Sequence, residues 1–196
     1  MSSGAVPLRE ATAIATRIGK ALADDSLRVQ VAGSIRRRKP TVGDIELVAV
    51  PRITHETVPT MFEAESVPYN HLRARLEAMI RAGDLAPHPE DPKFGERYAK
   101  LWAPEGIQVD LFMPANLDSF GTILLIRTGP AAWSERLVTD ARRRGHHFAD
   151  GELHRGVVSC KGAAPGTARC ERVPTPDEAH VFRALGMAYV EPRNRA

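Results

Sequence analysis

Long apolar runs are missing from this 196-residue chain, because no window approaches the roughly 18 apolar residues of a membrane span. The start of the chain, MSSGAVPLREATAIA, also lacks the basic segment and apolar block of a signal peptide. Neither a membrane protein nor a secreted protein is therefore expected. These absences predict a soluble protein of the cytoplasm.

Cysteine is scarce, with only Cys160 and Cys170, which flank a loop rich in Gly, Pro and Ala. Their spacing matches no metal-binding motif, and unpaired thiols are the ordinary state in a reducing cytoplasm. The cysteines therefore indicate neither a metal site nor a disulfide. Internal repeats and low-complexity segments are lacking too.

Net charge is small, +3, and it is unevenly placed. Residues 1–116 hold 15 Lys and Arg against 15 Asp and Glu, whereas residues 117–196 hold 12 against 9. An excess of this size is weak evidence for a polyanionic partner. Hydrophobic content of 43% and charged content of 26% are ordinary for a globular protein, and the length allows one compact domain or two small ones.

The most informative stretch runs from Val31 to Val50, VAGSIRRRKPTVGDIELVAV. It contains a Gly33-Ser34 turn, a basic run and a predicted strand that begins at Asp44. Successive side chains on a strand point to opposite faces, so Asp44 and Glu46 share one face and the apolar residues between them take the other. Two neighbouring carboxylates repel each other, and a divalent cation such as Mg²⁺ would remove the repulsion.

Groups suited to phosphate stand next to these carboxylates. The Gly33-Ser34 turn offers backbone N–H groups and a hydroxyl, and the basic run from Arg36 to Lys39 offers guanidinium groups. Metal and phosphate ligands this close in sequence suggest metal-assisted chemistry on a nucleoside triphosphate.

A third carboxylate stands in a predicted strand over residues 107–113. Apolar residues alternate with Asp110, which is the only charge in that strand. A lone aspartate in a strand is commonly a solvated residue at the edge of a sheet. Beside the strand of Asp44 and Glu46, it becomes a candidate third ligand for the same metal ions.

Helical spacing of apolar residues predicts helices over 7–24, 69–82, 119–126, 131–144 and 174–182. Residues 97–103 are expected to form a strand, with Tyr98 and Leu101 as core contacts. Residues 52–67 show no clear periodicity and are expected to form a loop. Short strands with a mobile loop near 162–166 are expected between 146 and 173.

The predicted helix over residues 131–144 ends in Arg142, Arg143 and Arg144. Cations at a helix C-terminus complement the helix dipole, so this run can serve as a cap. The alternative is a contact with the DNA backbone. The sequence leaves both interpretations open.

Three carboxylates, a Gly-Ser and a Thr-Gly thus occur in the order Gly33-Ser34, Asp44-Ile45-Glu46, Asp110 and Arg127-Thr128-Gly129. In this order the chain resembles the family X DNA polymerases, the polymerase β-like group of the nucleotidyltransferase superfamily. More specific to family X are Ser34-Ile35-Arg36-Arg37 running into Gly43-Asp44, and the C-terminal pairs Pro174-Thr175, Asp177-Glu178 and Val181-Phe182, followed by Tyr189-Val190-Glu191-Pro192. The resemblance extends from about Pro7 to Arg193.

The resemblance implies an α/β (α+β) fold, with a nucleotidyltransferase palm of mixed β-sheet and flanking helices over residues 1–116. A small α+β thumb that contacts nucleotide and DNA is expected over residues 117–196. The chain is similar to minimal palm-plus-thumb polymerases of some viruses and microbes, without the N-terminal lyase and helix-hairpin-helix segments of longer members.

The resemblance also implies two-metal nucleotidyl transfer. Asp44 and Glu46 would bridge two Mg²⁺ ions, for which Mn²⁺ can substitute. Asp110 would ligate the catalytic ion alone and help to deprotonate the primer 3′-hydroxyl. The nucleotide-binding residues implied are Gly33, Ser34, Arg37 and the Gly43 backbone for the phosphates, and Arg127, Thr128 and Gly129 near the incoming sugar. Arg36 would support the palm structurally.

Several positions depart from the family pattern. Glu46 stands where family X usually has Asp, and the superfamily accepts either. Ile126-Arg127 replaces the usual aromatic pair before Thr-Gly, which leaves selectivity between dNTP and NTP open. Val138 stands at the place of a thumb arginine, and Ala5 at that of an N-terminal arginine.

The main hypothesis is a monomeric, template-directed DNA polymerase that uses dNTPs on gapped or primer-template DNA in repair, encoded by a microbe or a virus. A second hypothesis is a transferase of the same chemistry without a template, acting on DNA ends, RNA or a small molecule. A third is a non-catalytic module that binds DNA ends. The third is disfavoured because such a module has no reason to keep three mutually repulsive carboxylates.

Overall fold

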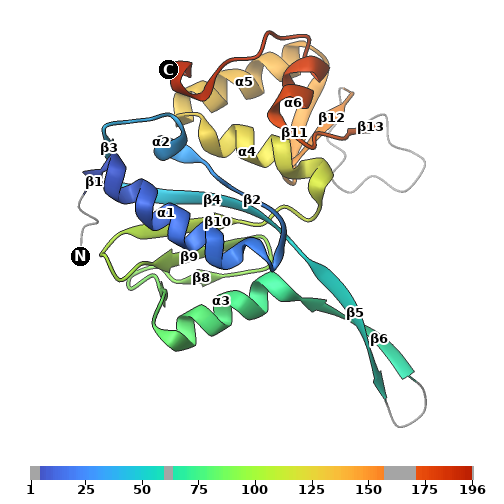
Figure 1. The fold of residues 1–196 in the computed structure, drawn as a ribbon. Coiled ribbons are helices and arrows are strands. Elements are labelled where there is room, and N and C mark those ends of the chain that lie inside the picture. The colour runs from blue at the N-terminus through green and yellow to red at the C-terminus, as the bar shows by residue number, and fades with distance from the viewer. Residues whose placement is uncertain (1–4, 60–63, 157–170, 196) are drawn as a thin grey trace.

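The computed structural model describes residues 5–59, 64–156 and 171–195. Cys160, Cys170 and the predicted loop near 162–166 lie outside these described residues. Within the described ranges, the chain first builds a sheet flanked by helices and then a smaller part with its own helices and strands (Figure 1).

The first part is organised around one sheet, which contains six strands among the described residues. These strands are β2 (Ser26–Val31), β4 (Asp44–Pro51), β7 (Ala86–Pro87), β8 (Lys93–Phe94), β9 (Tyr98–Trp102) and β10 (Gln108–Phe112). The order is β2-β4-β10-β9-β7, with β8 also paired to β9. β4 and β10 run parallel and the other pairs are antiparallel, so the sheet is mixed, as predicted. The short strands β1 (Val6–Pro7) and β3 (Thr41–Val42) pair separately.

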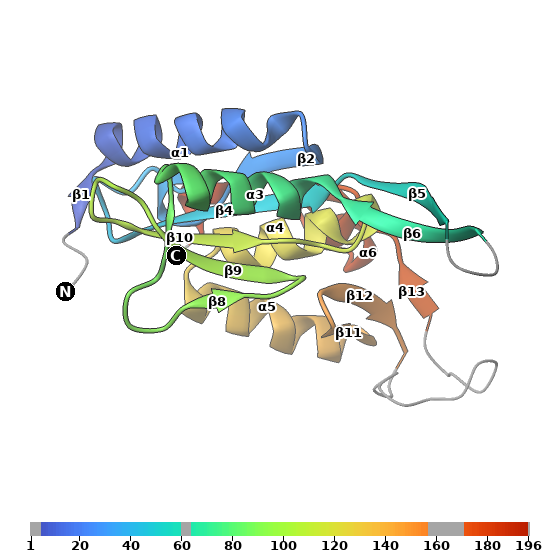
Figure 2. The ribbon, with the colours of Figure 1, turned by 90° about the horizontal axis from the view of Figure 1, so that it is seen from below.

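Helices α1 (Leu8–Ala23) and α3 (His71–Ala82) cover one face of this sheet (Figure 2). Both helices were expected from their apolar spacing, and both bury that stripe, including Leu22 and Leu76. Burial of one such side chain stabilises the fold by roughly 1.5–3 kcal/mol. The Asn70 side chain caps the start of α3, and Gly83 ends it in the left-handed conformation, with φ of 80°.

The opposite face of the sheet is only partly covered. α4 (Phe120–Thr128) packs on Val48 and Val50 in the C-terminal half of β4. Asp44 and Glu46 lie on the same face of β4 as Val48 and Val50, because the four residues alternate along the strand, but they occupy its N-terminal half. There the sheet borders a cavity instead of a helix.

Strands β5 (Ile53–Pro59) and β6 (Ala64–Asn70) form an antiparallel arm that extends beyond the end of β4 (Figure 1). The prediction of a loop over residues 52–67 is therefore wrong. Every residue of the two strands except Asn70 is exposed. With no buried face, nothing selects an alternation of apolar and polar residues, and the usual strand signal is missing.

The second part has its own core. Its elements are η1 (Leu117–Ser119), α4, α5 (Ala131–Arg143), the sheet of β11 (His146–Ala149), β12 (Glu152–Arg155) and β13 (Glu171–Val173), α6 (Glu178–Ala184) and η2 (Pro192–Asn194). Leu125, Leu137, Leu153, Val181 and Phe182 pack together inside it. The predicted helices are present, and α4 continues to Thr128, so the chain breaks only at Gly129-Pro130.

The mixed α/β fold class predicted from the sequence is confirmed. The division between residues 116 and 117 stays a prediction, since α4 contributes Phe120 and Leu124 to a core with the first sheet and Leu125 to the core of the second part. None of the helices in the described ranges combines the length and apolar character that a bilayer crossing requires.

Candidate active site

The three predicted carboxylates line one cavity of about 930 Å³ between the sheet and the second part of the chain. Asp44 and Glu46 lie on β4, and Asp110 lies on the neighbouring parallel strand β10, where it pairs in register with Glu46. Asp110 is buried, with 8% of its surface exposed. β10 lies between β4 and β9, so Asp110 is not a solvated edge residue.

Asp110 is held on both of its oxygens. The Tyr98 hydroxyl donates to Oδ1 at 2.6 Å, and the Gln108 side-chain amide donates to Oδ2 at 2.8 Å. Burial raises the pKa of Tyr98, and its hydrogen bond to the Asp110 carboxylate raises it further. Tyr98 therefore stays a protonated donor at neutral pH. Tyr98 and Leu101 both contact core residues, as predicted, but Tyr98 packs on the cluster around Phe112 and also borders the cavity, while Leu101 lies in the core under α1 and α3.

The charges of the other two carboxylates are only partly compensated by nearby arginines. Burial raises the pKa of Glu46 to about 7, and the charges of Asp44 and Asp110 contribute to this rise. Burial likewise raises the pKa of Asp44, with a further contribution from Asp110 that Arg37 partly offsets. Both carboxyl groups are thus hard to ionise together in the metal-free protein.

The carboxylates do not converge on a single point. A Cβ placed on Gly33 would lie 2.0 Å from Glu46 Oε2, so the Glu46 carboxylate rests against the Gly33 backbone. Asp110 is turned toward Tyr98 and Gln108. In the parts of the chain that the structure describes, no three Asp, Glu, His or Cys side chains are arranged to hold a metal ion as they stand.

The donor set nevertheless fits a divalent cation. Mg²⁺ prefers oxygen ligands, and the site offers three carboxylates on two adjacent strands. A bound cation would also remove the repulsion among these carboxylates, which contributes to the raised pKa values of Asp44 and Glu46. Glu46 would turn away from Gly33 to face the cation, whereas each Asp110 oxygen keeps a second lone pair beside the one that accepts a hydrogen bond. The metal assignment stays a prediction.

Two buried polar atoms beside the carboxylates have no hydrogen-bond partner among the described residues: Ser34 Oγ and Arg37 Nε. Ser34 lies in α2 (Gly33–Arg36), and Arg37 is the C-cap of that short helix, so the two are neighbours on one helical turn. The predicted Gly-Ser turn is therefore a helical turn. Burial lowers the pKa of Arg37, although Glu46 and Asp44 oppose this. Unpaired buried donors are destabilising, and a phosphate oxygen is the acceptor that both groups suit.

A second cavity of about 720 Å³ adjoins the first. Asp44, Glu46 and Arg127 border both cavities, while Arg37 and Gly129 border only the second. The structure thus brings the carboxylates, Arg37 and Arg127 around one continuous region.

Arg127, on α4, lies over the ring of Phe112 on β10, with its Cζ 4.0 Å from the ring centroid. Its charge also lowers the pKa of Glu46 slightly, against the larger effects of burial and the other carboxylates. Arg127 is therefore a cation of the second part whose charge acts on a carboxylate of the first.

Thr128 and Gly129 are held in place by packing and hydrogen bonds, and of the two only Gly129 borders a cavity. Thr128 is fully buried, its hydroxyl accepts a hydrogen bond from Arg36 at 2.7 Å, and its carbonyl accepts one from Arg37. A Cβ on Gly129 would lie 2.5 Å from the Trp133 ring, so only glycine fits where α5 begins. Gly43 is exposed between β3 and β4, and a Cβ there would meet no atom within 4 Å.

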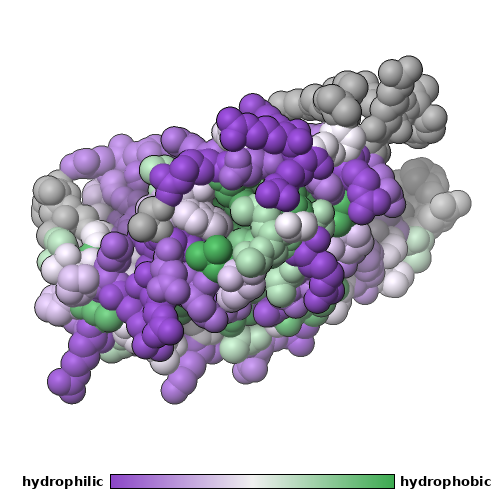
Figure 3. Space-filling view, turned by 90° about the horizontal axis from the view of Figure 1, so that it is seen from above, coloured by the Kyte–Doolittle hydropathy of each residue, from purple (hydrophilic) through white to green (hydrophobic). Residues whose placement is uncertain are grey.

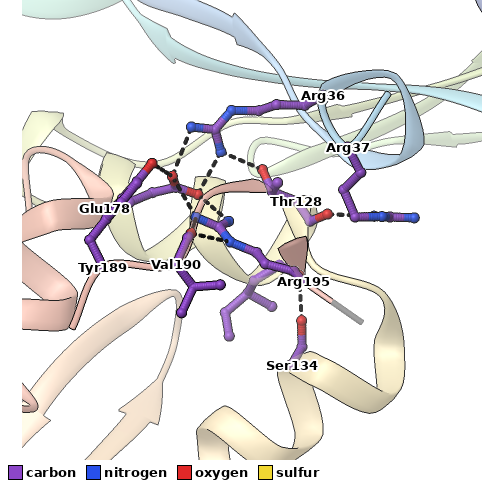
Figure 4. Close-up of polar contacts among 9 residues, drawn as sticks. Arg36, Arg37, Thr128, Ser134, Glu178, Tyr189, Val190 and Arg195 are labelled. Atoms are coloured by element: carbon purple, nitrogen blue, oxygen red, sulfur yellow. Dashed lines mark hydrogen bonds and ion pairs between the residues drawn. The ribbon is translucent and has the colours of Figure 1, made fainter. Parts of the chain in front are cut away.

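A buried ionic cluster lies beside Thr128 and is joined to it through Arg36 (Figure 4). Arg36 and Arg195 each form a two-bonded ion pair with Glu178, at distances of 2.5–3.0 Å. Tyr189 also donates to Glu178, and Arg195 donates to the Val190 carbonyl. Burial alone would raise the pKa of Glu178, but the bonds from Arg195 and Arg36 outweigh it and lower this pKa. Arg36 thus has the structural role that the resemblance implies.

The three C-terminal arginines of α5 lie away from both cavities. Arg143 pairs with Asp140 at 3.3 Å, and Arg144 donates to the carbonyls of Leu185 and Gly186, so Arg144 serves as a cap and a link to the end of α6. All three are exposed. Contact of these three arginines with DNA stays a prediction.

The face of the molecule on the side of α5 is hydrophilic around its margin and has an apolar area in the middle (Figure 3).

Tyr98, Gln108 and Arg97 belong to the site region but were not identified from the sequence. Arg97 donates to the Asp150 carbonyl at 3.3 Å, across the rim of the first cavity. The alternation of side chains along the predicted strand could have placed Tyr98 on the face opposite Leu101. Tyr98 and Leu101 have opposite parity, so they cannot share a face.

Two comparisons with known proteins bear on these features. Residues 123–196 match the family model described as the DNA polymerase beta thumb. The solved polymerase beta of Leishmania infantum, in a ternary P/T complex, matches with a TM-score of 0.69 and 18% sequence identity, over 100% of this chain and 78% of that one. The resemblance to family X polymerases is confirmed, in fold for the whole chain and in sequence for residues 123–196.

Proposed function

We propose that this polymerase β-like chain is a nucleotidyltransferase of the DNA polymerase type, which transfers a dNMP from a dNTP to a primer 3′-hydroxyl. The bond formed joins the 3′-oxygen to the α-phosphorus, and pyrophosphate leaves. One observation carries the proposal: Asp44, Glu46 and Asp110 border the same region as the unpaired Arg37 Nε. The match of residues 123–196 to the thumb model supports DNA as the partner.

Each group has a distinct part in the proposed reaction. Ser34 and Arg37 hold the β- and γ-phosphates with the donors that lack partners within the protein. Asp110, which is fixed by the hydrogen bonds from Tyr98 and Gln108, accepts the proton of the 3′-hydroxyl. Asp44 and Glu46 would hold two Mg²⁺ ions, with Asp110 on one of them. The chemistry that such ions would supply is a lower pKa of the attacking hydroxyl and neutralisation of the phosphate charge.

The test is extension of labelled DNA with Mg²⁺ on gapped, recessed and single-stranded substrates side by side. Template-directed incorporation on gapped DNA is expected, and Asp110→Ala is expected to abolish it. Incorporation by Asp110→Ala at the wild-type rate would overturn the assignment.

The same assay separates the alternatives. Each dNTP is offered singly opposite each template base. Equal use of all four would indicate terminal transfer, and labelling of RNA or a small molecule alone would indicate a non-polymerase transferase. Binding to DNA ends with no incorporation of any nucleotide would indicate a non-catalytic module.

A further inference from the structure

Asp110 accepts one of its two side-chain hydrogen bonds from an aromatic residue of the neighbouring strand and the other from Gln108 of its own strand. Tyr98 on β9 reaches diagonally across the strand pair, since the residue directly opposite Asp110 is Lys100. Lys100 bonds to Asp91 at 3.1 Å and is thus turned elsewhere. The Tyr98 hydroxyl, at 2.6 Å, is the shorter of the two hydrogen bonds that Asp110 accepts from Tyr98 and Gln108.

Tyr98 is itself held by a stack that leads to the second part of the chain. Tyr98 and Phe112 face each other across β9 and β10, with ring centroids 5.1 Å apart and planes inclined by 25°. Arg127 of α4 lies over the Phe112 ring at 4.0 Å. A series of direct contacts therefore runs from α4 through Phe112 and Tyr98 to Asp110.

We propose that Tyr98 is the positioning residue of Asp110 and that Arg127, through Phe112, makes this positioning depend on the placement of α4. The inference rests on the proposed function, in which Asp110 is a metal ligand and proton acceptor. This role in positioning Asp110 follows neither from the sequence motifs nor from the match to the thumb model.

The physical basis is the freedom of an aspartate side chain. Rotation about its terminal bond is broad, so a carboxylate without fixed donors samples many orientations. A hydroxyl on a stacked, rigid ring narrows that range. Partners that orient a metal ligand in this way typically alter metal affinity or activity by about 10–100-fold when removed. A shift of α4 would move Arg127 and thereby loosen or tighten the stack.

The first test compares Tyr98→Phe with Tyr69→Phe. The first substitution removes the hydroxyl and keeps the ring. The second is the same chemical change on the exposed arm, where 40% of Tyr69 is exposed. Mn²⁺ binding to each protein without nucleotide is measured by electron paramagnetic resonance of the free ion, and kcat and KM for dNTP are measured on gapped DNA.

Tyr98→Phe is expected to weaken Mn²⁺ binding and to lower kcat by about tenfold each, with KM for dNTP changed by less than about twofold. Its melting temperature is expected to stay within about 3 °C of wild type, as for loss of one partly buried hydrogen bond. Tyr69→Phe is expected to match wild type in all of these measurements. Wild-type Mn²⁺ affinity in Tyr98→Phe would overturn the inference.

The second test concerns Arg127. Arg127→Lys keeps the charge near Glu46 but loses the planar group that lies on Phe112. If Arg127 acts through Tyr98, the double variant loses no more Mn²⁺ affinity than Tyr98→Phe alone. Losses that add in the double variant would overturn the coupling to α4.

The metal measurement also separates this inference from the proposed function. If wild type binds no Mn²⁺, both proposals fail. If it binds Mn²⁺ more tightly than Tyr98→Phe but incorporates no nucleotide, the positioning role stands and the polymerase activity is overturned.

Discussion

Gly33 shows at the scale of one residue how sequence and site are connected. Its φ is +59°, a left-handed conformation that other residues adopt with strain, and a Cβ there would meet the Glu46 carboxylate. The glycine of the Gly-Ser motif is thus needed for the backbone and for the space that Glu46 occupies. The motif could be found in the sequence, but the contact with Glu46 could not, since it depends on the register of α2 against β4.

Gly33→Ala is expected to lower the free energy of unfolding by about 1–3 kcal/mol, because of the left-handed φ, and to displace Glu46. Urea unfolding measures the change in stability. Gly19→Ala is the control, because a Cβ at Gly19 in α1 would meet nothing within 4 Å. There the same substitution is expected to stabilise by about 0.5–1 kcal/mol. Equal effects at the two positions would contradict the role assigned to Gly33.

The pKa of Glu46 gives a second prediction at this scale. It is raised from 4.5 to about 7, so between these pH values the folded metal-free protein keeps a proton that the unfolded chain has lost. Protonated Glu46 therefore contributes to stability at low pH, and this contribution is lost as the pH rises from about 4.5 to about 7. In EDTA, urea unfolding from pH 5 to 8 is expected to show this decline in wild type and a smaller decline in Glu46→Gln.

Mg²⁺ is expected to restore wild-type stability at pH 8 and to do so less in Glu46→Gln, since bound metal stabilises the folded state. Equal pH dependence in the two proteins without metal would show that Glu46 does not titrate in this range.

At the scale of elements, the sequence predicted the strands and helices that bury an apolar face and missed those that do not. α1 and α3 each carry a buried stripe at the helical period, and β4 and β10 are buried along most of their length. The arm of β5 and β6 is exposed on both sides, and α2 is too short for a period to appear. Periodicity reports burial, so elements without it leave little trace in the sequence.

The link between α2 and α6 gives a prediction at the same scale. Glu178 joins Arg36 to Arg195, with 3% of Glu178 and 2% of Arg195 exposed. Glu178→Gln would leave two arginines without their counter-charge, and a loss of about 3 kcal/mol in the free energy of unfolding is expected. Urea unfolding measures this loss.

The matched control is Glu171→Gln, which removes a counter-charge from Arg155 at the surface. That pair is 3.8 Å apart, with side chains 62% and 75% exposed, so a change below about 1 kcal/mol is expected. A change in Glu178→Gln no larger than in the control would mean that the buried cluster contributes little to stability.

At the scale of the whole molecule, the contacts that join the two parts of the chain include three arginine contacts near the cavities. These are Arg36 with Glu178, Arg127 with Phe112, and Arg97 with the Asp150 carbonyl. The sequence could not predict them, because each joins residues far apart in the chain. It could predict the carboxylates, since the strand pattern alone puts Asp44 and Glu46 on one face.

The charge distribution predicts that DNA binding depends on salt. If Arg142 and Arg143 contact phosphates, Arg142→Ala/Arg143→Ala is expected to reduce the slope of log Kobs against log salt by about 2. Fluorescence anisotropy of labelled gapped DNA at several salt concentrations measures the slope. Arg9→Ala, on the exposed side of α1, is the control and is expected to leave it unchanged. An unchanged slope in the double variant would leave the run with its capping role alone.

The most direct measurement of the central claim is the rate of single-nucleotide incorporation into gapped DNA by wild type and Asp110→Asn, with Mg²⁺. Asparagine keeps the size of the side chain and loses its charge and basicity. Incorporation at least about a hundredfold slower than in wild type is expected, because Asp110 would lose both its metal-binding charge and its role as proton acceptor. Incorporation by Asp110→Asn at the wild-type rate would contradict nucleotidyl transfer at this site.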